Sequence, residues 1–136
     1  MFTGIIEEIA EVIAIERDKS NVNFTFSANM ANALKVDQSL AHNGCCLTVV
    51  EQNDRHYKVT VIQETLDRTN LTDWSVGTRV NLERCMKADG RFDGHIVQGH
   101  VDCVATCTQI LDLDGSWKYT FSYIADHETV EKGSIT

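Results

Sequence analysis

An internal repeat is the sequence feature that most limits how this chain can fold. When residues 4–41 are aligned without gaps on residues 99–136, seven of the 38 aligned positions are identical and five more are similar. The longest shared stretch pairs Phe24-Thr-Phe-Ser27 with Tyr119-Thr-Phe-Ser122. A general likeness between strands is the alternative explanation of this match. We expect instead one supersecondary unit used twice in the chain.

The repeat predicts two unequal domains, a whole unit at residues 1–98 and the first part of a second at residues 99–136. A complete second copy would extend well beyond Thr136, because the chain stops just before the counterpart of residues 42–48. A half-built sheet leaves unpaired strand edges. We expect a neighbour to cover these edges, another chain to exchange strands with them, or the edges to stay mobile.

Short strands separated by turn residues dominate the rest of the sequence. Strands are predicted at residues 5–15, 22–27, 57–62 and 76–82, a hairpin at 39–51, and a further strand that includes Cys103 and Cys107. The first of these suits a helix or a strand by periodicity alone, but its aligned partner at 104–110 is rich in Val and Thr, which favours a strand. Residues 29–35 predict at most two helical turns. This pattern is typical of an antiparallel sandwich or barrel.

Length and charge exclude several classes of protein. A chain of 136 residues is long enough for one well-packed domain and too short for two ordinary ones. Its formal net charge of −8 argues against nucleic acid or an anionic membrane as a partner. No stretch approaches the ~20 apolar residues of a membrane span, and the acidic start has no basic signal-peptide region. We expect a soluble, cytoplasmic protein.

The cysteines do not indicate a metal site. The chain has five, at Cys45, Cys46, Cys85, Cys103 and Cys107, and no two of them have C-x-x-C spacing. The last two lie four residues apart on an expected strand, where they would share a face and suit core packing. We expect neither metal binding nor structural disulfides.

The segment from Ser39 to Thr48 combines a turn signal with reactive side chains. Asn43-Gly44 supplies the positive φ angles of a tight hairpin. The arms of that hairpin hold Ser39, His42, Cys46 and Thr48 close to one bend. A plain hairpin with inert buried cysteines is the alternative.

Six motifs spread over the chain carry a resemblance to a known family. They are Met1-Phe-Thr-Gly-Ile-Ile-Glu7, Asn43-Gly-Cys-Cys-Leu-Thr-Val49, Glu64-Thr-Leu66, Arg68-Thr-Asn-Leu71, Val80-Asn-Leu-Glu83 and Gly94-His-Ile-Val-Gln-Gly-His-Val101. Together they resemble riboflavin synthase of the α-chain type, whose chain is a tandem of two barrels with a C-terminal helix, assembled as a homotrimer. The fold class implied here is all-β: a six-stranded antiparallel Greek-key barrel followed by the first part of a second, similar barrel.

The resemblance also implies a reaction. Two molecules of 6,7-dimethyl-8-ribityllumazine exchange a four-carbon unit and give riboflavin and 5-amino-6-ribitylaminouracil, with no metal or redox cofactor. Two copies of one reactant call for two similar pockets that face each other, which a duplicated domain can supply. A non-catalytic lumazine- or flavin-binding module on the same fold is the alternative. An oligonucleotide-binding barrel is a third class, which the charge disfavours.

The resemblance places two pockets on the sequence. The first is expected to use Phe2, Thr3, Gly4, Ile5, Ile6, Cys46, Leu47, Thr48, Thr60, Val61, Ile62, Gln63, Glu64 and Thr65. The second would begin with Gly99, His100 and Val101 and include Lys132. Backbone groups and threonine hydroxyls can pair with the pteridine edge, and Glu64 with ribityl hydroxyls. Phe2 is expected to pack the N-terminus against the bound ring, whereas Thr48 and Thr65 could equally be ordinary strand and turn residues.

Three side chains are candidates for the chemistry, which removes a proton from the 7-methyl group and adds a nucleophile at C7 of the partner. His100 is the candidate base or proton shuttle, since imidazole titrates near neutral pH. Ser39 and Cys46 are candidate nucleophiles or proton-handling groups, each without an activating partner identifiable from the sequence. A turn or capping role is the alternative for His100, and we expect His42 and His95 to be structural.

Overall fold

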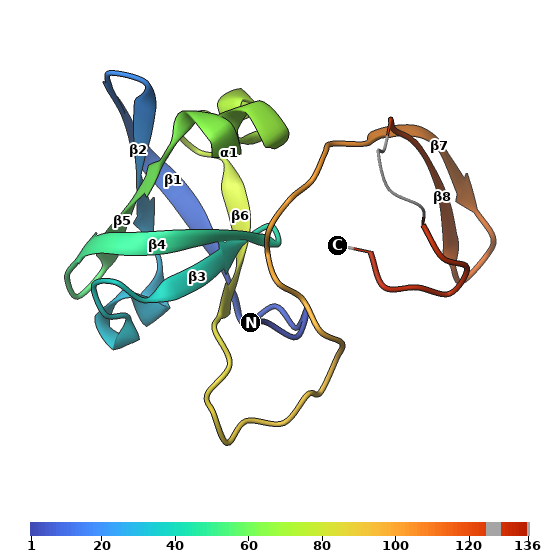
Figure 1. The fold of residues 1–136 in the computed structure, drawn as a ribbon, viewed down its shortest axis with the longest axis horizontal. Helices are drawn as coiled ribbons and strands as arrows, with labels where there is room; N and C mark the ends of the chain where they lie inside the picture. The colour runs from blue at the N-terminus through green and yellow to red at the C-terminus, as the bar shows by residue number, and fades with distance from the viewer. Residues whose placement is uncertain (125–128, 136) are drawn as a thin grey trace.

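The computed structural model describes residues 1–124 and 129–135. Its strands form one closed barrel and, beside it, a separate two-stranded sheet (Figure 1). The elements are β1 (Glu8–Asp18), β2 (Asn21–Ser27), the 3-10 helix η1 (Asn29–Ala33), β3 (Ser39–His42), β4 (Cys45–Gln52), β5 (His56–Val61), α1 (Gln63–Arg68), the 3-10 helix η2 (Leu71–Asp73), β6 (Arg79–Arg84), β7 (Thr106–Asp112) and β8 (Trp117–Ser122). The predicted all-β fold class is confirmed.

The barrel has Greek-key connectivity. Its strands follow the order β1-β2-β5-β4-β3-β6 and then close on β1, and every neighbouring pair is antiparallel. β3, β4 and β5 are consecutive neighbours, while β6 returns to lie beside β3. Closure leaves this sheet without a free edge.

Alternating side chains of the strands fill the barrel. On β2 and β5 the buried residues are every second one, as a strand with one face inward requires. Phe24 and Phe26 point inward, where Phe26 stacks on Tyr57 at a centroid distance of 5.1 Å and Trp74 meets the Phe24 ring edge-on at 5.4 Å. Aromatic pairs of this kind stabilise a core beyond the area that they bury.

The predicted hairpin forms as expected. β3 and β4 pair from Ser39 opposite Thr48 to His42 opposite Cys45. The two turn residues between them, Asn43 and Gly44, have φ angles of +47° and +86°. These are the angles that a two-residue hairpin turn needs, which explains the Asn-Gly pair.

Several element boundaries differ from the predictions. β1 begins at Glu8 rather than at residue 5, because the chain before it turns at Gly4 and is held by side-chain bonds to β6. β6 begins at Arg79 rather than at residue 76, after a turn at Gly77. The polar segment after β5 contains the short helix α1, and the predicted helix at 29–35 is a 3-10 helix.

The second sheet repeats β1 and β2 in detail. Cys107 pairs with Phe121 and Ile110 with Tyr119, as Val12 pairs with Phe26 and Ile15 with Phe24, and both ladders shift register at the same place. Three positions with positive φ also recur at the same spacing: Gly4 and Gly99, Lys19 and Asp114, and Asp37 and Lys132. The repeat seen in the sequence is therefore a repeat of backbone structure.

The prediction for the two C-terminal cysteines is wrong. β7 begins at Thr106, so Cys103 lies before the strand and does not share a face with Cys107. Both side chains are exposed rather than packed in a core. Within residues 1–124 and 129–135, no helix is long and apolar enough to cross a membrane.

Candidate functional site

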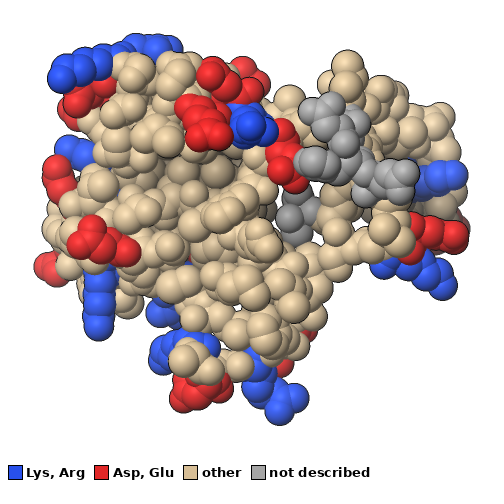
Figure 2. Space-filling view, in the orientation of Figure 1, with Lys and Arg blue, Asp and Glu red and all other residues tan. Residues whose placement is uncertain are grey.

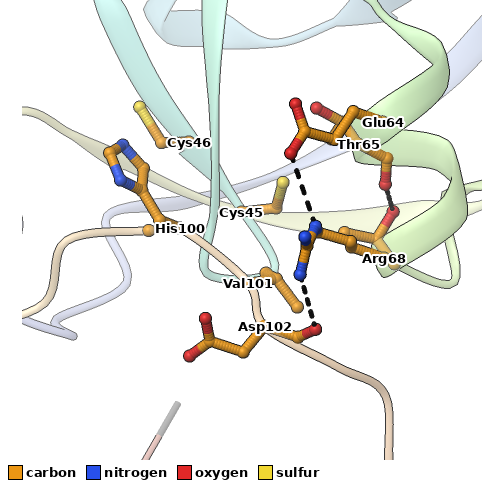
Figure 3. Close-up of a pocket in the computed structure, with 10 residues that line it drawn as sticks. Cys45, Cys46, Glu64, Thr65, Arg68, His100, Val101 and Asp102 are labelled. Carbon is orange, nitrogen blue, oxygen red and sulfur yellow. Dashed lines mark hydrogen bonds and ion pairs between the residues drawn. The ribbon is translucent and has the colours of Figure 1, made fainter.

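A pocket of about 510 Å³ opens where β4, α1 and the start of the second repeat meet (Figure 3). Its lining residues are Cys45, Cys46, Glu64, Thr65, Arg68, Thr69, Gly99, His100, Val101 and Asp102. A volume of this size suits a small organic ligand. The pocket is thus built from both repeats rather than from the barrel alone.

A close backbone contact docks the second repeat on the barrel. The Cys46 amide donates a hydrogen bond of 2.8 Å to the Gly99 carbonyl. Gly99 has a φ of +82°, and a Cβ on it would lie 2.7 Å from the Cys46 Cβ and 3.0 Å from the Cys46 nitrogen. Only glycine combines this φ with this approach.

Helix α1 provides a second connection to the same segment. The Arg68 Nη1 lies 3.5 Å from the Asp102 carbonyl oxygen, and its Nε lies 3.5 Å from Glu64 Oε1 one helical turn earlier (Figure 3). Thr69 donates its hydroxyl to the Thr65 carbonyl at 2.6 Å and so fixes the end of the helix. Residues 99–102 therefore lie between β4 and α1 as one wall of the pocket.

Two of the three candidate catalytic side chains lie together. Figure 3 shows the His100 ring and the Cys46 thiol on the same side of the pocket. Cys46 is half-buried and His100 exposed, so a ligand can reach both. Cys45 points into the barrel, where burial raises the pKa of its thiol to about 11, with a further contribution from Cys46. Of the two adjacent cysteines, Cys46 is the one placed for chemistry.

Ser39, the third candidate, does not line the pocket. It pairs directly with Thr48 on the outer face of the β3–β4 hairpin, the face that Cys46 also shares. Ser39 is therefore near the pocket along the barrel surface, and nothing in the described residues activates it.

The expected binding residues of β4 and β5 divide between the two faces of the barrel. Leu47 and Val61 are buried in the core and do not line the pocket. Thr60 donates its hydroxyl to Asn23 Oδ1 at 2.7 Å on the outer surface. Among the remaining residues expected in the first pocket, Thr48, Ile62 and Gln63 are exposed, and Glu64 and Thr65 line the pocket.

The N-terminal arm, residues 1–7, lies away from this pocket, contrary to the expectation for Phe2, Thr3, Gly4, Ile5 and Ile6. The physical reason is the buried carboxylate of Glu83 on β6. It accepts hydrogen bonds from the Thr3 amide at 2.6 Å, the Thr3 hydroxyl at 2.7 Å and the Gly4 amide at 2.9 Å. Phe2 is buried against Ala41 and Val97 and is not exposed to a ligand.

The two repeats also pair with each other at their beginnings. Phe2 and Val97, which occupy equivalent positions, exchange two backbone hydrogen bonds of 2.8 and 3.0 Å. The start of each repeat therefore lies beside the start of the other, and we call this arrangement the crossing of the repeats. This crossing explains why Gly99, His100 and Val101, expected in the second pocket, lie in the first. Lys132, also expected in the second pocket, is exposed and does not line this one.

His42 is structural, as expected. It is fully buried; because a carbonyl can only accept, its Nδ1 donates to Leu40 O at 3.1 Å and its Nε2 accepts from the Tyr57 hydroxyl at 2.9 Å. Burial lowers the pKa of His42 to about 3, against a smaller opposing effect of the Leu40 bond. His95 packs against Gly4, with its Nδ1 buried and unpaired among the described residues.

Four lining residues were missed by the sequence analysis: Cys45, Arg68, Thr69 and Asp102. Arg68 had a usable signal, since Glu64 and Arg68 are spaced as an ion pair on a helix. No sequence pattern pointed to Asp102, because its approach to α1 depends on the crossing of the repeats. In residues 1–124 and 129–135, no three His, Cys, Asp or Glu side chains lie together as a metal site would require.

A second hollow of about 720 Å³ lies elsewhere on the barrel, lined by residues that include Glu8, Asn29, Asp54, Arg55 and Arg79. It is larger but more open, and none of the candidate residues lines it. The Glu8 carboxylate in it already accepts hydrogen bonds from the amides of Asn29 and Met30, at 2.5 and 2.9 Å. The smaller pocket is therefore the better candidate site.

Comparisons with known proteins identify relatives of this chain. The lumazine binding domain family matches residues 3–85. Riboflavin synthase of Bacillus amyloliquefaciens is 40% identical over 139 residues, which cover 100% of this chain and 65% of that protein. Riboflavin synthase of Saccharomyces cerevisiae is 42% identical over 147 residues, covering 99% of this chain and 61% of the relative. The chain thus spans less than two thirds of these relatives' length.

Solved structures of a protein named LumP share the fold. The complex of LumP with 6,7-dimethyl-8-(1'-D-ribityl) lumazine superposes with a TM-score of 0.81 at 20% identity, covering 93% of this chain and 71% of LumP. The complex of LumP with flavin mononucleotide gives a TM-score of 0.73 at 23% identity, covering 82% of this chain and 63% of LumP. At these identities the likeness concerns the fold.

Proposed function

Because this chain belongs to the lumazine binding domain family, we propose that its pocket binds 6,7-dimethyl-8-ribityllumazine and the product riboflavin, and that it acts in the riboflavin synthase reaction. The observation that carries this proposal is the pocket itself, in which Cys46 and His100 come together from the two repeats. The riboflavin synthases that match the whole chain support it. A cytoplasmic location and the division into residues 1–98 and 99–136 are parts of the same proposal.

Binding uses the backbone and the polar end of the pocket. The polar edge of the pteridine pairs with backbone groups near Cys46 and with the Thr65 side chain, while Val101 packs against the ring. The ribityl chain extends toward Glu64, whose carboxylate accepts hydrogen bonds from hydroxyl groups. These contacts orient one reactant, which is the main contribution that a site can make to a reaction between two identical molecules.

His100 and Cys46 handle protons in the proposed mechanism. The reaction begins when a proton leaves the 7-methyl group of one lumazine, and His100 is the group that accepts it. Cys46, half-buried beside His100, donates or accepts a proton in the later eliminations or adds at C7. Cys45 takes no part, since its raised pKa keeps it a thiol at neutral pH.

The second lumazine needs a second pocket that faces the first. Gly4 has a φ of +84°, close to the +82° of Gly99, and Ile5 and Ile6 after it are exposed. We therefore assign Gly4–Ile6 to the wall of the equivalent pocket of a second barrel, as Gly99–Val101 form the wall of the first. Assembly of a homotrimer would bring two such pockets face to face.

The test is to add 6,7-dimethyl-8-ribityllumazine to the purified chain and to follow both binding and riboflavin absorbance. Saturable binding with slow or no formation of riboflavin is expected, because one described barrel provides one pocket. Rapid formation of riboflavin would show that the chain itself brings two lumazines together. Absence of saturable binding would overturn the proposal.

A non-catalytic binding module is the second candidate function. The LumP complexes support it, since that protein was crystallised with a lumazine, with riboflavin and with flavin mononucleotide. His100→Gln separates the two candidates. If His100 accepts the proton, slow turnover of the wild type should disappear in His100→Gln while lumazine still binds, whereas a binding module should form no riboflavin with either protein.

A further inference from the structure

Three of the residues that line the pocket are charged. They are Glu64 and Arg68 on α1 and Asp102 on the segment opposite. Glu64 and Arg68 lie on the side away from Cys46 and His100, whereas the Asp102 carboxylate points away from Arg68 (Figure 3). Two carboxylates and one guanidinium give this group a net charge of −1, in a chain whose formal net charge is −8. Figure 2 likewise shows acidic side chains beside a basic one on the face that carries α1.

The single cation of this group is already engaged. The Nε of Arg68 faces Glu64 Oε1 at 3.5 Å, and its Nη1 faces the Asp102 carbonyl oxygen at 3.5 Å. The Arg68 and Glu64 side chains are 54% and 72% exposed, so their ion pair is weak. Arg68 therefore offsets part of the negative charge around it and does not present a free fork to an anion.

Such a group suits a polyol and not a phosphate. A hydroxyl both donates and accepts, so a ribityl chain can donate to the carboxylates and accept from Arg68. A phosphate ester at the end of that chain adds about 1.5 to 2 negative charges at neutral pH and has no strong donor to offer. Placing it in a pocket lined by two carboxylates and one engaged cation adds negative charge to a site that is already negative, which is unfavourable.

We propose that Glu64, Arg68 and Asp102 make this pocket select a ligand with an uncharged ribityl chain and reject its 5'-phosphate ester. This inference rests on the proposed function, because it takes the ribityl chain to lie at the charged end of the pocket. It adds to that function a basis for specificity, with Asp102 and Arg68 as specificity-determining residues. LumP, which has been crystallised with flavin mononucleotide, makes this ester the natural probe.

The experiment compares the affinities of riboflavin and flavin mononucleotide for the same protein by quenching of flavin fluorescence at pH 7.5 and low salt. Wild type is expected to bind riboflavin at least about tenfold more tightly. Glu64→Gln and Asp102→Asn should each reduce the ratio of the two dissociation constants about threefold or more, and Arg68→Gln should increase it. Because the readout is a ratio, an equal loss of both affinities does not affect it.

Asp67→Asn is the matched control. It removes one negative charge from the same helix, but Asp67 does not line the pocket and pairs with Gln63 at 2.7 Å. Its ratio should stay near that of wild type. A wild-type ratio near one would overturn the inference, and so would a high ratio that Glu64→Gln and Asp102→Asn change no more than Asp67→Asn does. Absence of riboflavin binding would instead overturn the proposed function.

Discussion

Gly99 makes the backbone contact that holds the second repeat against β4 of the barrel. Its positive φ and the 2.7 Å approach of a Cβ to Cys46 leave no room for a side chain. In Gly99→Ala we expect residues 99–102 to lift from β4 and the affinity for riboflavin to fall at least about tenfold, since a misplaced wall loses its contacts. A fluorescence titration measures this loss.

Gly77→Ala is the control for that prediction. Gly77 has a φ of +92°, but a Cβ there would meet nothing within 4 Å. This variant carries the backbone strain of about 1 kcal/mol without the clash, and it should keep the affinity for riboflavin. Equal loss of affinity in both variants would contradict the docking role of Gly99.

The buried His42 makes stability depend on pH. The folded state holds His42 neutral, with a pKa lowered to about 3, whereas the unfolded chain takes up a proton near pH 6.5. This contribution is complete above pH 6.5 and is lost as the pH falls toward 3. We expect the free energy of unfolding to decrease by about 1 kcal/mol per pH unit between pH 6 and pH 4 from this group alone.

Urea unfolding at several pH values tests this dependence. In His42→Phe the slope between pH 6 and pH 4 should be smaller, although the loss of the Tyr57 bond lowers stability at every pH. His56→Gln, which replaces a histidine outside the core, should keep the wild-type slope. A slope unchanged in His42→Phe would contradict the assignment.

The sequence allowed some site residues to be predicted and not others. Cys46 and His100 were found from motifs, and the structure brings them together. Phe2 to Ile6 are expected in the first pocket but do not line the one described, because Glu83, about 80 residues away in sequence, holds Thr3 and Gly4. No spacing pattern reports such a contact. Asp102 was missed for the same reason.

Among the elements, the N-terminal arm is notable for how tightly β6 holds it. Glu83 accepts three hydrogen bonds from Thr3 and Gly4, and the next residue, Arg84, pairs with Glu7 through its backbone amide at 2.7 Å and its Nε at 2.8 Å. Burial acts to raise the pKa of Glu7, but the bonds and charge of Arg84 outweigh it and lower the pKa. The arm is thus fixed even though Ile5 and Ile6 face solvent.

Glu83→Gln tests how much the hydrogen bonds from Thr3 and Gly4 to Glu83 contribute to the stability of the fold. An amide can accept through one atom only, so the amide of Thr3 or of Gly4 loses its partner, and we expect a loss of about 1 to 3 kcal/mol in the free energy of unfolding. Glu51→Gln is the comparison, because Glu51 forms an exposed ion pair with Lys58 at 3.3 Å and should change stability by less than about 1 kcal/mol. Urea denaturation measures both losses. Similar losses in the two variants would contradict a stabilising role of the Glu83 hydrogen bonds.

Element types were predictable where one face of a strand is buried. β2 and β5 alternate clearly and were placed within a residue or so, because their inward side chains are all apolar. The start of β1 was misplaced by three residues, since Ile5 and Ile6 look like core residues but are exposed. A sequence pattern alone does not distinguish exposed apolar residues from apolar residues of the core.

On the scale of the whole molecule, the crossing of the two repeats at Phe2 and Val97 decides where the site lies. It places the first residues of the second repeat on the first barrel, so the pocket combines parts of the chain separated by about 50 residues. The duplication predicts two pockets. It does not predict that the first residues of each repeat lie at the pocket of the other repeat, because the same sequence is compatible with each repeat completing its own pocket.

The central claim is that a ribityl-bearing bicycle binds between β4, α1 and residues 99–102. The most direct measurement is a titration of the isotope-labelled chain with riboflavin, followed by the backbone amide signals in NMR spectra. We predict saturable shifts concentrated at Cys46, at residues 64–69 and at residues 99–102, with the arm at Thr3–Ile6 little affected. Shifts confined to the arm or to the hollow around Glu8 and Arg79, or no shifts at all, would contradict it.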